Sequence, residues 1–307
     1  MKNILLPVFL FYVFIASAQL TLQEKLGYSK ETKLLIIHAD DLGVSHSENE
    51  ASIHAMENGS VNSASIMVPC PWFPEIAAYA RTHPKADLGL HLTLTSEWKY
   101  YKWGPVVSKE KVPGIVNKGG FLFESVDSLQ RSGKAVEVEK ELRSQIERAK
   151  HFGIDITHFD SHMGSLFGKR DYLKVLIKLG REYKVPVLLS KPAMQFAYNL
   201  NLDSFTNAKD VVLDMIYMAY PNDYKNGMEN YYAGVFKAVQ PGVSIILLHA
   251  AYDDREMQAV TIDHPEYGAA WRQADFNFFT SENCKKLLQE QHIQLITWRE
   301  IRDKLLR

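Results

Sequence analysis

The feature that most constrains the fold of this sequence is an alternation between short apolar runs rich in β-forming residues and longer segments of helical period. Such alternation is typical of repeated βα units, which build parallel sheets and barrels. The predicted strands are Leu34–Ala39, Val61–Val68, Leu88–Leu94, Ile156–Asp160, Val185–Ser190, Val243–His249 and Ile293–Trp298. The predicted helices are Ser47–Asn58, Trp72–Thr82, Val136–Phe152, Lys169–Tyr183, Glu229–Val239 and Ser281–Gln291. We expect one α/β domain over residues 33–307, folded as a distorted or incomplete (β/α) barrel similar to a TIM barrel.

Two segments interrupt the alternation. Ser96–Gly120 is rich in Gly, Pro and aromatic residues without a clear period, and Tyr252–Gly268 is similar. Both follow the carboxyl end of a predicted strand, where barrel enzymes place their chemistry. We therefore interpret both as functional loops rather than simple connections.

The first residues of the chain differ from the rest. Lys2 is followed by an apolar run from Ile4 to Ile15, and Ala16-Ser17-Ala18 has the small-x-small pattern of a cleavage site. This pattern predicts a signal peptide over residues 1–18, cleaved after about Ala18, and a short arm over residues 19–32. The alternative is an uncleaved membrane anchor, but the apolar run is shorter than the roughly 20 residues that span a bilayer. We expect an exported protein, either periplasmic or secreted.

The charge balance narrows the choice of partner. There are 35 basic and 36 acidic residues, so the formal net charge is -1. No general attraction to nucleic acid or to an anionic membrane follows from that balance, which favours a small or neutral partner. The two cysteines, Cys70 and Cys284, are too few for a disulfide framework, and both one bridge and two buried thiols stay open. The number of chains that assemble is also open, with a homodimer among the alternatives.

Polar side chains follow several predicted strands at the point where each strand ends. The strand ends carry Asp40 and Asp41, then His91, then His158, Asp160 and His162, then His249. Because the carboxyl ends of parallel strands meet on one face of a barrel, these side chains can share a site. Each has an ordinary structural alternative, since an Asp pair can cap a helix and a histidine can sit hydrogen-bonded in the core. Their joint occurrence at strand ends favours the shared site.

The composition of this group indicates a metal site. Two adjacent carboxylates repel each other when both are ionised and desolvated, and a divalent cation relieves that repulsion. One carboxylate with two imidazoles suits Zn, Mn, Co, Ni or Mg and leaves positions open for water and substrate. We predict that Asp41, His91 and His162 hold one divalent metal ion, whose identity the sequence does not fix. Asp40 is then placed to act as general base.

Four ordered motifs give the sequence a resemblance to a known family. They are Ala39-Asp40-Asp41-Leu42-Gly43, Asn58-Gly59-Ser60-Val61, Gly89-Leu90-His91-Leu92 and Thr157-His158-Phe159-Asp160-Ser161-His162. In order and spacing, over roughly residues 33 to 300, the chain resembles the YdjC-like (ChbG-type) carbohydrate deacetylase family, which includes chito-oligosaccharide deacetylases. The resemblance implies a distorted barrel related to NodB-type polysaccharide deacetylases. It also implies the roles of metal ligand for Asp41, His91 and His162, and those of catalytic base for Asp40 and proton donor to the leaving group for His249.

The sequence departs from the family pattern in two places. Met163-Gly164-Ser165 follows His162 where family members often continue with further histidines, and His38 stands where an asparagine is frequent. The metal set is intact, but the surroundings of the substrate differ. Many relatives are cytoplasmic, so the predicted export signal indicates an extracellular or periplasmic glycan as substrate.

The expected function is removal of acetyl groups, from nitrogen or oxygen, of an acetylated carbohydrate. Aromatic rings can stack on sugars, so Trp98, Trp103 and Tyr252 are candidate substrate contacts, with His158 beside them; packing of the loop onto the barrel is the alternative. A non-catalytic glycan-binding barrel is the rival from another class. Another metal-dependent hydrolase, such as a phosphoesterase, is disfavoured because the acids are adjacent rather than Asp-x-Asp and no phosphate-binding loop is present.

Overall fold

The computed structural model describes residues 20–307, and the predicted signal peptide, residues 1–18, lies outside the described residues. The strands are β1 (Lys33–Leu42), β2 (Ser63–Ile66), β3 (Leu88–Leu92), β4 (Phe159–Ser161), β5 (Met215–Met218), β6 (Gly242–Leu248) and β7 (Ile293–Leu295). The α-helices are α1 (Leu22–Lys25), α2 (His46–Asn58), α3 (Phe73–Thr82), α4 (Val126–Ser132), α5 (Ala135–His151), α6 (Arg170–Tyr183), α7 (Lys191–Tyr198), α8 (Pro221–Lys225), α9 (Met228–Ala238), α10 (Arg255–Val260), α11 (Ala269–Phe279), α12 (Glu282–Glu290) and α13 (Trp298–Leu305). Short 3₁₀ turns lie at Lys109–Lys111, Pro113–Ile115, His162–Gly164 and Leu202–Ser204.

All the strand pairs are parallel, and β1 lies at the centre of the sheet. The strand order is β4-β3-β2-β1-β6-β5. On one side of β1, β6 pairs with it from Lys33 to Ala39. On the other side, β7 pairs with the start of β1 and β2 pairs with its end. The apolar run of β1 is buried over almost its whole length, because both faces of a parallel barrel strand are covered.

The barrel closes only irregularly, between β4 and β5. The segment Val185–Ser190, predicted as a strand, forms no ladder and joins its neighbours through single bridges, Phe159 with Val187 and Ser190 with Leu213. Pro186 has no N–H to give to a ladder, which explains why the regular pairing fails there. The expected strand is therefore wrong as regular structure, although its place in the barrel is right. The incomplete barrel itself is confirmed.

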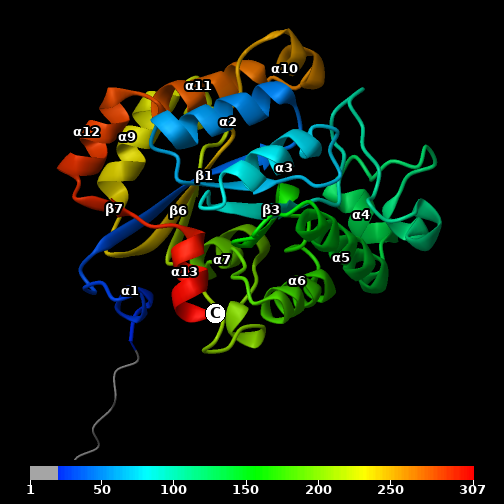
Figure 1. The fold of residues 1–307 in the computed structure, drawn as a ribbon, viewed down its shortest axis with the longest axis horizontal. Coiled ribbons are helices and arrows are strands. Elements are labelled where there is room, and N and C mark those ends of the chain that lie inside the picture. The colour runs from blue at the N-terminus through cyan, green and yellow to red at the C-terminus, as the bar shows by residue number, and fades with distance from the viewer. Residues whose placement is uncertain (1–19) are drawn as a thin grey trace, which may run out of the picture.

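The interior of the barrel is layered along its axis. Its amino-terminal part is apolar, and α1 and α13 close that end; this layer contains Leu26, Leu34, Ile36, Leu188, Leu213, Val243, Ile245, Ile296, Trp298 and Ile301. On β1 the residues that follow on the same face are His38 and Asp40, both buried. The interior therefore changes from apolar to polar towards the carboxyl ends of the strands. The helices surround the sheet, with α2 and α11 side by side on one flank (Figure 1).

The remaining differences from the sequence predictions lie in both halves of the chain. The predictions missed the helices α1, α4, α7, α8, α10, α11 and α13, and the strand predicted at Ile156–Asp160 begins only at Phe159. The predictions missed β5, which is only half-buried and short, and they extended the last strand to Trp298, which begins α13. Of the two alternatives for the cysteines, the structure has two buried free thiols. Among residues 20–307, no helix is both long enough and apolar enough to cross a lipid bilayer.

Candidate functional site

The adjacent acids Asp40 and Asp41 lie on an irregularity at the end of β1. The pairing with β2 shifts register between Ala39 and Leu42, and Asp41 has a φ of 68°. In a regular strand neighbouring side chains point to opposite faces, so Asp40 and Asp41 would be separated by the sheet. A bulge with one residue in the left-handed region re-aims a side chain, and Asp is among the residues that tolerate that region. Both carboxylate side chains therefore lie at the same end of the barrel.

The three predicted metal ligands meet. Oδ1 of Asp41 lies 3.4 Å from Nε2 of His91 and 3.3 Å from Nδ1 of His162. Zinc binds nitrogen and oxygen at roughly 2.0–2.1 Å, so the edges of its tetrahedron are about 3.4 Å long. Asp41, His91 and His162 come from the ends of β1, β3 and β4, and their donor atoms are spaced to hold one cation.

The hydrogen bonds around the three residues fit a metal centre. Oδ1 of Asp41 is buried and has no hydrogen-bond partner among the described residues. Nδ1 of His91 donates to Oδ1 of Asp160 at 2.7 Å, and Nε2 of His162 donates to the Glu97 carboxylate at 3.0 Å. Because a carboxylate only accepts, each imidazole in its neutral form, the form that binds a metal, carries its proton on the far side and turns a lone pair towards Asp41. Carboxylate–histidine pairs of this kind orient ligands in metal sites.

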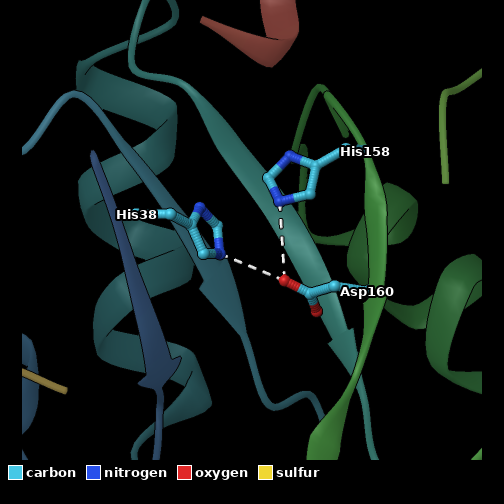
Figure 2. A group of neighbouring side chains, drawn as sticks. All are labelled: His38, His158 and Asp160. Carbon is cyan, nitrogen blue, oxygen red and sulfur yellow. Dashed lines mark hydrogen bonds and ion pairs between the residues drawn. The ribbon is translucent and has the colours of Figure 1, made fainter. Parts of the chain in front are cut away.

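Two other groups have donor atoms at comparable spacing, and both fit a cation less well. The group of Asp40, His91 and Asp160 would use Nδ1 of His91, which already donates to Asp160. The group of His38, His158 and Asp160 is buried deeper in the barrel, and Nε2 of His38 carries its proton there, because it lies 3.0 Å from Oδ2 of Asp160, which only accepts (Figure 2). The set of Asp41, His91 and His162 leaves its inward atoms free, as a ligand set must.

The electrostatics of the site favour positive charge between these residues. Burial disfavours ionisation of Asp41, but the Arg272 guanidinium and His162 outweigh it and hold the pKa of this carboxyl well below its ordinary value. Burial also disfavours the charged imidazole of His162, yet Glu97 and Asp41 raise its pKa to about 10. Burial opposes the charge on His91 as well, and Asp160 and Asp40 raise its pKa. Carboxylates therefore outnumber fixed cations here, a field that a divalent cation would satisfy.

Arg272 on α11 belongs to the site, although nothing in its local sequence indicates it. Its guanidinium is buried and donates from Nη2 to Oδ2 of Asp41 at 2.9 Å and from Nη1 to Glu48 at 2.8 Å. One positive charge faces two buried carboxyl groups. Burial raises the pKa of Glu48 to about 8, so below that pH Glu48 accepts the bond as a neutral acid while Asp41 carries the charge.

Glu97 is the second functional residue that the sequence predictions missed. It lies in the loop after β3 that was predicted to be functional, and the loop returns to the barrel through a bridge between Thr95 and Phe123. The Glu97 side chain is 13% exposed and reaches His162. The sequence signal that could have identified Glu97 is its place as an acidic residue in the loop directly after the strand that carries His91.

His249 lies where β6 ends and faces the mouth of the barrel. Its backbone N–H donates to Asp275, and its Nε2 lies 3.9 Å from Oδ2 of Asp41. Burial is the main cause that lowers the pKa of His249 to about 4, so with the protein groups alone the imidazole is neutral at pH 7. The structure thus brings His249 to the predicted ligands and to Asp40.

Trp98 and Trp103, predicted as aromatic contacts of the substrate, do not form an exposed surface. Trp98 and Trp103 are each 3% exposed and pack into the core, and Nε1 of Trp103 donates to the Thr95 carbonyl. The alternative, packing of the loop onto the barrel, is what the structure shows for them. His158 is fully buried below the ligands, against Trp298, so the assignment of His158 to substrate contact is wrong. The Tyr252 hydroxyl is 3.0 Å from Nδ1 of His54 on α2, and its contact with substrate stays a prediction.

Comparisons with known proteins show what the whole chain is similar to. A family model described as YdjC-like protein matches residues 34–290. A carbohydrate deacetylase of Thermus thermophilus is 27% identical over 290 residues, which cover 92% of this chain and 99% of the relative. A carbohydrate deacetylase of Brevibacillus brevis is 28% identical over 277 residues, covering 87% of this chain and 99% of the relative. The crystal structure of an Enterococcus faecalis V583 protein, proposed to cleave cellobiose phosphate, matches with a TM-score of 0.73 at 23% identity and covers 88% of this chain and 99% of that chain.

Proposed function

Because this chain belongs to the YdjC-like family, we propose that it is a metal-dependent hydrolase that removes acetyl groups from a carbohydrate. The relatives named carbohydrate deacetylase align over nearly their whole length, which supports the reaction. The observation that carries the metal dependence is the buried, unpartnered Oδ1 of Asp41, which faces two imidazoles whose far nitrogens are held by carboxylates.

Asp41, His91 and His162 would hold the cation. A divalent cation supplies Lewis acidity, which makes water a stronger acid and a carbonyl carbon a better electrophile at neutral pH. The rest of the chemistry falls to the side chains of the chain. Arg272 keeps Asp41 ionised for this task, and Asp160 and Glu97 keep the two imidazoles turned inward.

Asp40 is the proposed general base. Its Oδ1 accepts from Ser65 at 3.2 Å and lies 3.1 Å from Nε2 of His38. Its Oδ2 takes no hydrogen bond from the residues that the structure describes, and the residue is 5% exposed. One oxygen is therefore anchored from below, and the other is free to take a proton from water at the mouth of the barrel.

His249 is the proposed acid for the leaving group. Sugar amines leave poorly as anions, so a proton must reach the nitrogen as the bond to the acetyl carbon breaks. The His249 side chain is 15% exposed and lies nearest Oδ2 of Asp41, whereas the imidazoles of His91 and His162 face Oδ1. Because its pKa of about 4 leaves the imidazole neutral at pH 7, His249 must take up a proton during the reaction before it passes one to the leaving nitrogen. The water from which Asp40 removes a proton is the source.

The test is acetate release from a panel of N-acetylated and O-acetylated oligosaccharides, with and without chelator. We expect release that chelator abolishes and a divalent cation restores. Asp40→Asn should bind the cation as the wild type does and lose turnover, whereas His91→Ala should lose both. Full turnover in Asp40→Asn would remove that residue from the role of base. Cation binding without any acetate release would instead favour a glycan-binding protein.

We further propose that the substrate is a periplasmic or extracellular glycan. This rests on the apolar run of residues 4–15 and the small residues before Gln19. Expression of the full chain followed by mass measurement of the exported product checks it. A product that begins near Gln19 supports export, and a full-length product retained inside the cell contradicts it.

A further inference from the structure

A layer of fully buried polar side chains lies directly below the candidate metal site, inside the barrel. His38 and His158 are each 0% exposed and Asp160 is 2% exposed. Ser63 and Ser65 of β2 complete the layer and are also fully buried. Burying such groups costs free energy, and an apolar core would avoid that cost. The proposed function, as described above, gives Asp160 the task of orienting His91 and mentions Ser65 and His38 only as contacts of Asp40.

Asp160 is the point where this layer meets the metal ligands. Its Oδ1 accepts from Nδ1 of His91 at 2.7 Å, and its Oδ2 lies 3.0 Å from Nε2 of His38. One carboxylate thus orients His91 above and binds His38 below. The orientation of His91 depends on where Asp160 is held.

His38 joins Asp160 to the proposed base. The same Nε2 that faces Asp160 lies 3.1 Å from Oδ1 of Asp40. On the other side of the ring, Nδ1 lies 2.9 Å from Oγ of Ser63, which fixes the plane of the imidazole. We propose that His38 is a positioning residue that sets the places of both Asp40 and Asp160, and so couples the base to the metal ligand His91; this rests on the proposed function.

A second cation bound by His38, His158 and Asp160 is the competing explanation. The imidazole nitrogens of His38 and His158 are 3.0 Å and 3.7 Å from Oδ2 of Asp160, and Figure 2 shows both turned towards that oxygen itself. A metal would need a lone pair on each nitrogen, but Nε2 of His38 carries its proton towards Asp160, whose carboxylate only accepts. Nε2 of His38 is also within hydrogen-bond distance of Ser65. The geometry therefore favours a hydrogen-bonded hub over a metal site, and the two differ in the number of cations per chain.

The test uses the full chain, with zinc alone as the probe, and compares His38→Ala and His38→Gln with the control His158→Gln. His158 is buried to the same degree in the same layer and also faces Asp160, but it makes no contact with Asp40. We expect one zinc per chain throughout. His38→Ala should bind zinc about 10-fold more weakly, because Asp160 loses its lower partner. His38→Gln, whose amide N–H can replace Nε2, should recover part of that loss, and His158→Gln should stay near the wild type.

Turnover gives a second reading. His38→Ala should lower kcat about 100-fold at unchanged KM, as expected for a base that has moved by about 1 Å. His38→Gln should recover part of that kcat, and His158→Gln should keep kcat near the wild-type value. A merely structural role would lower the stability of His38→Ala but leave the kcat of its folded, zinc-loaded chains unchanged.

Several outcomes overturn the inference. Wild-type zinc affinity and wild-type kcat in folded His38→Ala would remove His38 from this role. Two zinc ions per wild-type chain, falling to one in His38→Ala, would establish the second cation instead. If His38→Ala does not fold, Ser63→Ala decides, since it frees the ring at Nδ1 and should lower kcat and zinc affinity in the same direction. If the wild type releases no acetate but His38→Ala still weakens zinc binding, the proposed function fails while the coupling to His91 stands.

Discussion

The buried guanidinium of Arg272 donates to Oδ2 of Asp41 at 2.9 Å, across 231 positions of sequence. The bond joins the helix α11 to the bulged end of β1. Its two partners carry opposite charges, and both side chains are buried. Oδ2 is thereby occupied, and Oδ1 is left as the oxygen that faces the imidazoles of His91 and His162. Arg272 thus decides which oxygen of Asp41 is available to a cation.

Arg272→Met should destabilise the protein most when no cation is bound. Removing one partner of a buried ion pair costs about 3–5 kcal/mol, because the other charge is left unpaired. A bound divalent cation would neutralise Asp41 and reduce that loss. Urea unfolding in chelator and in excess zinc measures both values. Arg302→Met is the matched control, since Arg302 is equally buried but pairs with Asp155, away from the site, and its effect should not depend on zinc. Equal losses for Arg272→Met in both conditions would contradict the assignment.

Glu97→Ala should weaken cation binding without unfolding the chain. Glu97 holds Nε2 of His162 at 3.0 Å, and loss of such a partner typically costs about 10-fold to 100-fold in metal affinity. Glu97→Gln keeps an acceptor for the imidazole N–H, so its cation affinity should lie between those of the wild type and Glu97→Ala. Zinc titration calorimetry provides the measurement. Glu124→Ala, in the same loop and paired only with Lys102, should bind as the wild type does. An unchanged affinity in Glu97→Ala would mean that His162 is oriented by other means.

His249→Asn should affect amide substrates far more than activated esters. Loss of a general acid costs roughly 100-fold to 10,000-fold when the leaving group needs a proton, and little when it does not. We expect a large fall in kcat for an N-acetylated oligosaccharide and a small one for an aryl acetate. His264→Asn, which removes a ring packed on Trp98 rather than on Asp41, serves as control. Equal losses on both substrates would assign His249 to binding rather than to proton donation.

Glu48 should make the stability of the fold fall as the pH rises. Burial raises its pKa from 4.5 to about 8. A carboxyl whose pKa is raised by folding contributes stability that is complete below pH 4.5 and is lost as the pH rises through about 8. In that window the wild type should lose up to about 1.4 kcal/mol per pH unit relative to Glu48→Gln, which cannot ionise. Thermal or urea unfolding of both proteins between pH 5 and 9 measures the difference. Parallel curves would show that Glu48 is already ionised at low pH.

The ligand set could be predicted from sequence because its residues stand at the ends of strands with strong apolar runs. Leu34–Ile37 and Leu88–Leu90 identify the strands that end near the ligands Asp41 and His91, and Val243–Leu248 identifies the strand before His249. The run before the third ligand, His162, is shorter and was marked by Ile156. Arg272 could not be predicted in this way, because it lies inside a helix and reaches the site through the fold alone. The same holds for β5, whose four residues are only half-buried and leave no strong pattern.

The place of His158 was predictable in principle from strand geometry. His158, Asp160 and His162 alternate along one strand direction and so point to the same side. Extended chain rises about 3.3 Å per residue, so His158 lies roughly 13 Å before His162 measured along the chain direction, towards the apolar end of the barrel. The predicted contact of His158 with substrate was wrong because a residue on the inner face of a strand can lie too deep in the barrel to reach its mouth. The same reasoning places His38 about 7 Å below Asp40.

The left-handed residue in the bulge of β1 limits how this chemistry could be transplanted. A designer who copied only the Asp-Asp pair onto a straight strand of another barrel would obtain one acid inside and one outside. Asp40 and Asp41 face the same end of the barrel only because the pairing of β1 with β2 is irregular there. A transplanted site must therefore include the bulge and the neighbouring strand as well. Random mutagenesis at position 41 faces the same restriction, because most side chains would have to strain the chain to occupy that place.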